Sequence, residues 1–268
     1  MGARRVGLRA RVARWFGVLA PRGWRDFVLQ VGLLGSFELV YALSGLYGRH
    51  EAGQAVANAR GLVGLERRLG VAWEHGAQSW VLHGPQVLLE VANRTYFSSQ
   101  FAVSTLFLLW VYARRNAQFA RVRNALLAAN YVSVIVLFAY PLAPPRMVPG
   151  GGFADTLAEN AVNLHSRVID LLNNPYSAMP SLHASYALVL AIAGVALTRR
   201  LWVKLAWALY PCLVAFSVVA SGNHFVLDVV AGALALLATP LVAWAAGRVA
   251  SGTNRSDAVQ VSTEQGGA

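Results

Sequence analysis

Six stretches of predominantly apolar residues recur along the chain, near 27–47, 97–113, 125–142, 181–198, 203–221 and 225–246. Each is close to the roughly 20 residues that a helix needs to cross the hydrocarbon core of a bilayer. Short arginine clusters separate the second stretch from the third and the fourth from the fifth. The pattern predicts an all-α fold, an integral membrane six-helix bundle contained in residues 27–248.

Two segments between these stretches are too polar to cross a membrane. In the first, residues 49–96, apolar side chains recur at helical spacing at Leu62, Leu65, Leu69 and Trp73. This spacing predicts extracytoplasmic amphipathic helices that lie on the membrane. The second segment, residues 143–180, is rich in Pro and Gly, so we expect a fixed, irregular loop at the surface.

Both ends of the chain are polar. Residues 1–26 interleave arginines with apolar residues, which fits a cytoplasmic basic arm lying on anionic headgroups and equally fits a disordered tail. Residues 249–268 are rich in Gly, Ser, Thr and Gln, and we expect a disordered cytoplasmic tail.

The composition supports a membrane protein. Hydrophobic residues make up 56% of the chain and charged residues 13%, whereas a soluble domain has about 25% charged residues. The net charge of +11 comes from arginines that flank apolar runs, as in membrane proteins, so nucleic acid is not an expected partner. All but one of the 23 basic residues are arginine, a composition associated with GC-rich bacterial genomes, and we expect a bacterial plasma membrane.

The basic residues also predict an orientation. With the N-terminus inside, the short clusters at 114–123 and 199–204 face the cytoplasm, in line with the positive-inside rule. The basic residues left outside are Arg49, Arg60, Arg67, Arg68, Arg94, Arg146 and Arg167. All six histidines then fall on the outer side, and Asp228 lies about one turn inside the last helix. Because ionisable groups in a span are costly, this placement indicates a functional site on the outer face.

The first candidate motif is Pro180-Ser181-Leu182-His183, at the outer start of the fourth span. Ser181 is placed as a helix N-cap, where its hydroxyl and the following backbone N–H groups form an anion site. His183 would lie beside a phosphate bound there. An ordinary cap followed by an interfacial histidine explains the same residues.

The second motif is His224-Phe225-Val226-Leu227-Asp228. His224 and Asp228 are four residues apart and share one helix face, close enough for a hydrogen bond. An aspartate that accepts from one imidazole nitrogen fixes the tautomer and raises the basicity of the other nitrogen. A buried polar pair that joins helices is the structural alternative.

The third motif is Arg146 in "PLAPPR", where two prolines stiffen the backbone around a guanidinium suited to phosphate. An interfacial arginine that meets lipid headgroups is the alternative. The predicted topology places all three motifs on one side of the membrane, which favours one shared site.

Taken together, "APPR", "NPYSAMPSLHASY" and "SGNHFVLDVVAG" resemble the type 2 phosphatidic acid phosphatase and haloperoxidase superfamily. Within it, the chain is most similar to the inositol phosphorylceramide synthase-like inositolphosphotransferases. The motifs cover about residues 140–232, and the six-span layout extends the likeness over most of the chain.

The resemblance implies a role for each motif. His224 attacks phosphorus and becomes a phosphohistidine, Asp228 orients it, and His183 protonates the leaving alkoxide. The groups that hold the phosphoryl oxygens are implied to be Arg146, Ser181 and Leu182 with its neighbouring backbone N–H groups. No metal or cofactor is required. The expected partners are a phospholipid or polyprenyl-phosphate substrate in the membrane and an alcohol or polyol acceptor.

Three departures from the broad phosphatase pattern favour the transferase-like branch. Ala139 stands where the pattern has lysine, Val218 where it has arginine, and Leu182 where it has glycine. Two other functions fit the same residues. A metal-dependent intramembrane hydrolase would use the two histidines and Asp228 as ligands, and a non-enzymatic lipid transporter or scaffold would only bind headgroups.

Overall fold

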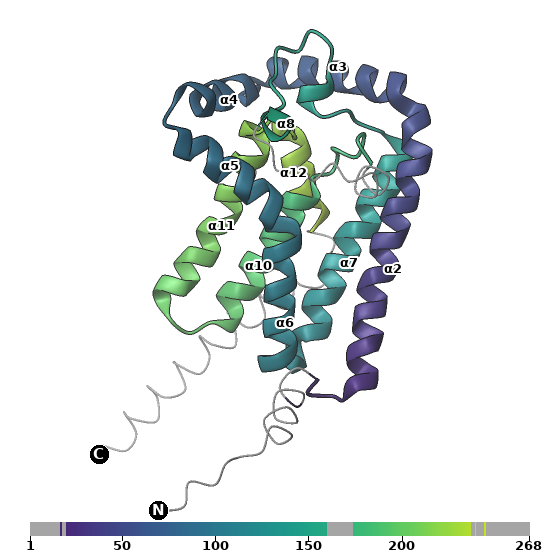
Figure 1. Cartoon of the computed structure of the whole chain (residues 1–268), viewed down its shortest axis with the longest axis vertical. Coiled ribbons are helices and arrows are strands. Elements are labelled where there is room, and N and C mark those ends of the chain that lie inside the picture. The colour runs from purple at the N-terminus through teal and green to yellow at the C-terminus, as the bar shows by residue number, and fades with distance from the viewer. Residues whose placement is uncertain (1–16, 18–19, 160–173, 237–238, 240–243, 245–268) are drawn as a thin grey trace, which may run out of the picture.

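The computed structural model describes residues 17, 20–159, 174–236, 239 and 244 of the 268-residue chain. Most of the basic arm expected at 1–26 and all of the tail expected at 249–268 lie outside the described residues. In the described part, helices dominate and run mostly along the long axis of the molecule (Figure 1). The expected all-α class is confirmed.

Among the described residues, four helical segments are long and apolar enough to cross a membrane. They are α2 (Trp24–Gly48), the run from α5 (Gln86–Ser98) through η2 (Ser99–Val103) into α6 (Ser104–Arg114), α7 (Asn116–Ala139) and α11 (Leu201–Ala220). Two shorter apolar helices, α10 (Leu182–Leu197) and α12 (Val226–Ala235), lie where the fourth and sixth spans are expected. The membrane-protein assignment holds with four candidate spans rather than the six expected.

The ends of two helices differ from the expected ones. The second span begins at Gln86 rather than near 97, because the π-helical turn η2 continues α5 directly into α6. The third begins at Asn116 rather than near 125, so Arg121 and Arg123 lie within α7 and not in a connecting loop. Arg123 donates to the side chain of Gln30 on α2. An arginine can lie within a membrane helix because its long side chain places the guanidinium near the end of the helix.

Helix α10 lies at the centre of the bundle and packs against α7, α11 and α12. Small residues allow these close contacts. A Cβ atom on Gly194 would lie 2.4 Å from the ring of Trp207 in α11, and one on Gly232 would lie 2.3 Å from the carbonyl oxygen of Ser181. The Ser185 hydroxyl of α10 donates to the Gly232 carbonyl of α12 at 2.8 Å. These contacts fix how the two short helices cross.

Two further helices, α3 (Ala52–Leu69) and α4 (Glu74–His83), lie across one end of the bundle (Figure 1). We call this the α3–α4 end. The buried face of α3 consists of Ala55, Ala59, Leu62 and Glu66. Of the apolar residues expected on a helix that lies on the membrane, Leu62 is buried, whereas Leu65, Leu69 and Trp73 are exposed on the protein surface. Their contact with a membrane stays a prediction. Two small alanines and Leu62 let α3 pack on the segment around Leu142.

The expected irregular segment at 143–180 contains only two short helices in its described part, η3 (Pro145–Met147) and α8 (Thr156–Glu159). Residues 160–173, which include His165 and Arg167, lie outside the described residues. The two ends of the segment pair with each other. The Leu142 amide donates to the Tyr176 carbonyl at 2.8 Å, and the Ala178 amide donates to the Leu142 carbonyl at 3.2 Å.

Candidate active site

His224 and Asp228 are in direct contact at the start of α12. Nδ1 of His224 lies 3.1 Å from Oδ1 of Asp228 and 3.1 Å from the carbonyl oxygen of Ala178. Both side chains are buried, with 6% of His224 and none of Asp228 exposed. The expected contact between residues four apart is present, although the backbone turns into the helix only after His224.

The contacts of Nδ1 determine the tautomer of His224. A carbonyl oxygen can only accept, so the hydrogen bond to Ala178 places the proton on Nδ1 and leaves a lone pair on Nε2. Burial, together with the positive charge of Arg146, lowers the pKa of His224 to about 3. The ring is therefore neutral at physiological pH, which is the form in which an imidazole can act as a nucleophile.

His183 lies next to His224. Their ring centroids are 5.5 Å apart and the rings meet edge to face at 65°. The other side of His183 stacks on Tyr96 of α5, with ring centroids 4.4 Å apart and an interplanar angle of 21°. Two helices that are distant in sequence thus bring an imidazole and its supporting aromatic ring beside the buried His224.

Ser181 caps α10 as the sequence predicts. Its hydroxyl accepts from the Ala184 amide at 3.3 Å, and its own amide donates to the Asp228 carbonyl at 2.9 Å. The side chain is fully buried. Leu182 packs into the main apolar core, so only its backbone N–H, one of the N-terminal donors that lack a partner within the helix, points to an anion role.

Arg146 is held by two side chains. Its guanidinium donates to Oδ1 of Asn223, and its Nε lies 3.3 Å from Oδ2 of Asp155. Asn223 is oriented for this contact because its amide nitrogen donates to the Ser221 hydroxyl at 2.8 Å. Since 17% of the Arg146 side chain is exposed, the guanidinium sits at the edge of the buried histidine pair.

Direct hydrogen bonds join the three sequence motifs. The Arg146 amide donates to the Gly222 carbonyl at 3.1 Å, two residues before His224. Gly222 has a φ of +72°, and a Cβ there would lie 2.8 Å from Gln78, so this tight turn requires glycine. With the bonds from Ser181 to Asp228 and from His224 to Ala178, the motifs form one connected site.

Helix α4 supports the loop that carries Asp155. Gln78 donates to the Ala154 carbonyl at 3.0 Å and accepts from the Ala154 amide at 2.9 Å. His75 stacks on Phe153 with ring centroids 3.9 Å apart. Part of the segment 49–96 therefore helps to position the ion pair at Arg146.

Sequence reasoning missed five side chains around the site: Asn223, Asp155, Tyr96, Glu66 and Glu74. The two glutamates accept from backbone amides of α12, Glu66 from Leu227 at 2.8 Å and Glu74 from Val226 at 2.9 Å. The sequence could have indicated Glu66, because it follows Leu62 by four residues and therefore lies on the same face of the helix.

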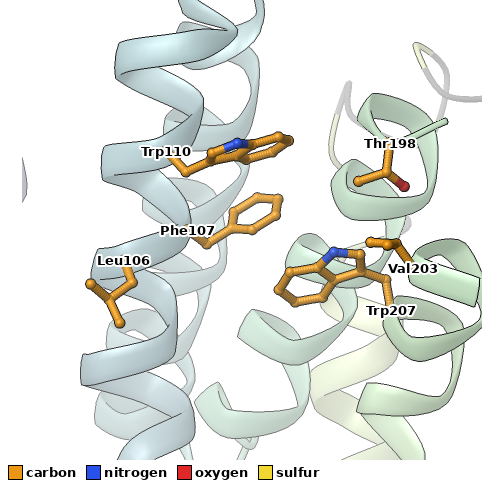
Figure 2. A pocket seen from close by; sticks show the side chains of 6 residues that line it. All are labelled: Leu106, Phe107, Trp110, Thr198, Val203 and Trp207. Atoms are coloured by element: carbon orange, nitrogen blue, oxygen red, sulfur yellow. The ribbon is translucent and has the colours of Figure 1, made fainter. Parts of the chain in front are cut away.

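A groove of about 400 Å³ is lined by side chains of α6 and of the α10–α11 region (Figure 2), namely Leu106, Phe107, Trp110, Thr198, Val203 and Trp207. No titratable side chain lines it. It offers an apolar surface and no group able to act on phosphate.

The described residues contain no group of three or more His, Cys, Asp or Glu side chains arranged to bind a metal ion. The comparison with protein families matches the model described as the PAP2 superfamily over residues 60–242. This range includes Arg146, His183, His224 and Asp228. Comparison with curated proteins and with solved structures finds no significant match.

Proposed function

The chain belongs to the PAP2 superfamily, and from this premise we propose that it is a membrane phosphotransferase that works through a phosphohistidine at His224. Membership indicates phosphatase or phosphotransferase chemistry on lipid phosphates. The observation that carries the proposal is the buried His224, protonated on Nδ1 and 5.5 Å from His183.

The proposed reaction has two steps. In the first, Nε2 of His224 attacks phosphorus, the bond to the lipid alkoxide breaks, and protonated His183 gives its proton to that alkoxide. Asp228 stabilises the positive charge that develops on the imidazole. In the second, a hydroxyl gives its proton to His183 and attacks phosphorus, and the bond to Nε2 breaks. Arg146 and the first amides of α10 stabilise the phosphoryl oxygens in both steps.

An alcohol or polyol is the proposed second substrate. Val218, at the position where the phosphatase pattern has arginine, is fully buried. Its carbonyl accepts from the amides of Asn223 and His224 at 3.2 and 3.1 Å. The site therefore has one phosphate ligand fewer than that pattern. Helices α3 and α4 lie over the start of α12 (Figure 1), and a covered site favours a bound acceptor over water.

We further propose that six helices cross the membrane, with α10 and the helix that begins at α12 as the fourth and sixth, and that the α3–α4 end faces outward. The short basic clusters near Arg114 and Arg200 support this orientation through the positive-inside rule. The substrate is then a phospholipid or polyprenyl phosphate of the outer leaflet.

The test is to trap the covalent intermediate. Purified protein in lipid nanodiscs is mixed with a phospholipid that carries radiolabelled phosphorus, and quenched samples are analysed for an acid-labile, base-stable label. We expect the label in the wild type and none in His224→Ala. His183→Ala, His224→Ala and Asp228→Ala should each reduce turnover on the order of 100-fold or more.

His83→Ala is the matched control, because His83 is exposed on α4 and, in the part of the chain that the structure describes, its ring bonds to Ser79 of the same helix. This variant should retain wild-type activity. Labelling or turnover that persists in His224→Ala would contradict the proposal. Treatment with EDTA should leave activity unchanged, whereas a loss that zinc restores would favour the metal-dependent alternative. Binding of lipid without turnover would favour a transporter or scaffold.

A further inference from the structure

The first turn of α12 is bound by three carboxyl groups. The amide of Phe225 donates to Asp228 at 2.9 Å, that of Val226 to Glu74 at 2.9 Å, and that of Leu227 to Glu66 at 2.8 Å. Asp228 belongs to α12 itself, whereas Glu66 and Glu74 come from α3 and α4. The amides at the start of this helix are therefore occupied by the protein's own carboxyl groups.

Both glutamates are buried, with no exposed surface on Glu66 and 4% on Glu74. Among the described residues, Oε2 of Glu66 is buried without a hydrogen-bond partner, and Glu74 is the carboxyl group to which a protonated Glu66 can donate. Two buried carboxylates side by side repel each other strongly, and sharing one proton removes that repulsion. The positive end of the α12 dipole stabilises the single remaining negative charge.

These contacts act directly on the reacting histidine. Phe225 directly follows His224, and Asp228 lies on the turn that the three carboxyl groups bind. A shift of this turn would change the 3.1 Å separation between Nδ1 of His224 and Asp228. Displacements of about 1 Å in a catalytic site can cost on the order of 100-fold in rate.

We propose that Glu66 and Glu74 form a proton-sharing clamp that positions His224 and Asp228, and that the clamp opens when Glu66 loses its proton. The two glutamates are positioning residues, since they touch neither the phosphate nor its acceptor. The proposal rests on the proposed role of His224 as nucleophile. It also assigns the outer segment a function, because the clamp is the link between α3–α4 and the catalytic helix.

The charges around Glu66 determine the direction of the pH effect. Burial, with the neighbouring carboxyl groups of Glu74 on α4 and Asp228 on α12, raises the pKa of Glu66 to about 8. From the segment around Leu142, Tyr140 donates to the Asn58 carbonyl of α3, and burial raises the pKa of its phenol, which stays neutral. The clamp is therefore closed below about pH 8 and opens above it.

The raised pKa of Glu66 also makes the free energy of unfolding depend on pH. The folded protein binds this proton more tightly than the unfolded chain, where a glutamate has its ordinary pKa of 4.5. The stabilising contribution is complete below about pH 4.5 and is lost as the pH rises through about 8.

The test compares Glu66→Gln with Glu66→Leu in nanodiscs between pH 6 and 9. Glutamine keeps an acceptor for the Leu227 amide and a donor for Glu74, and it cannot ionise. We measure kcat, KM and the hydrogen-exchange protection factors of the amides at 225–228, corrected for the intrinsic exchange rate. Glu90→Gln is the control, because Glu90 is exposed in a surface pair with Arg94.

The wild type and the Glu90 control should lose turnover and amide protection between pH 7 and 9, while Glu66→Gln keeps both. Glu66→Leu at pH 7 should lower kcat and the protection factors by about tenfold, with a smaller change in KM. The clamp is refuted if Glu66→Gln loses activity at alkaline pH as the wild type does, or if Glu66→Leu keeps wild-type protection. Amide protection is measured without substrate, so this result is independent of whether His224 carries the phosphoryl group.

Discussion

At the scale of single residues, the reactivity of His224 depends on the acceptors that surround Nδ1. Its ring hydrogen bonds to the Ala178 carbonyl and lies beside Asp228. The carbonyl fixes the tautomer of the neutral ring, and in the proposed reaction the carboxyl group of Asp228 stabilises the charge that the ring gains. Nδ1 therefore has two acceptors with different roles: the Ala178 carbonyl orients the ring, and the Asp228 carboxyl group is placed to stabilise positive charge on it.

Arg146→Lys should reduce kcat/KM by about 10- to 100-fold, because an ammonium cannot contact Asn223, Asp155 and a phosphoryl oxygen with the planar fork of a guanidinium. The measurement is steady-state kinetics on the labelled phospholipid. Arg94→Lys is the control, since Arg94 is exposed and pairs only with Glu90 on the same helix surface. Kinetics in Arg146→Lys equal to those of the control would remove Arg146 from the phosphate site.

The sequence identified the groups with recognisable chemistry but not their supports. Arg146, His183, His224 and Asp228 stand out because each is polar at the end of an apolar stretch. Their supports are ordinary residues that reach the site only through the fold. The Ala178 carbonyl and the Tyr96 ring are examples, because a backbone acceptor or a stacked ring leaves no pattern in the sequence.

At the scale of helices, the crossing of α10 and α12 brings the two histidine motifs together. The Ser181 amide donates to the Asp228 carbonyl, and Ser185 donates to Gly232. The Gly232 backbone lies so close to the backbone of Ser181 that only a small residue fits at position 232. The helix crossing is therefore part of the geometry of the site.

Gly232→Ala should destabilise the protein by about 1–3 kcal/mol and strongly reduce turnover, because the new Cβ would lie 2.3 Å from the Ser181 carbonyl oxygen. Thermal unfolding in detergent, followed by far-UV circular dichroism, measures the first effect. In the control Gly64→Ala, the new Cβ meets nothing within 4 Å, and removing a helix glycine should stabilise by up to about 1 kcal/mol. Equal melting temperatures for the two variants would contradict the close crossing.

The centres of the helices could be predicted from hydropathy, and several of their ends and faces could not. Apolar stretches located α2, α7 and α11 because burial in lipid requires them. The early start of α5 depends on the π turn at Ser99–Val103, which hydropathy does not register. The face by which α3 packs on the protein could not be predicted either, because two alanines and a glutamate are buried there beside Leu62, whereas Leu65 and Leu69 are exposed.

For the whole molecule, the orientation in the membrane can be tested with single cysteines in a Cys212→Ser background. Arg60→Cys on α3 should react with an impermeant thiol reagent in intact cells, whereas Arg200→Cys, between α10 and α11, should react only after the membrane is opened. Both positions are exposed. The reverse pattern would place the three motifs on the cytoplasmic side and overturn the outward-facing site.

In the proposed reaction, a phosphorylated His224 can pass its phosphoryl group to an alcohol or to water. A hydroxyl held in line with phosphorus reacts far faster than one that must diffuse to it, and this advantage is worth on the order of several kcal/mol. Helices α3 and α4 lie against the start of α12 through Glu66 and Glu74, so they are placed to exclude water and to bind an acceptor. With polyol or glycan acceptors present, transfer products should therefore exceed free phosphate and free phosphorylated head group.

Glu74→Leu should shift the ratio of transfer to hydrolysis products toward hydrolysis, because it loosens the contact of α4 with the start of α12. Chromatographic analysis of labelled products gives the ratio, with Glu90→Gln as the unchanged control. If hydrolysis products dominate with every acceptor tried, the protein is a phosphatase.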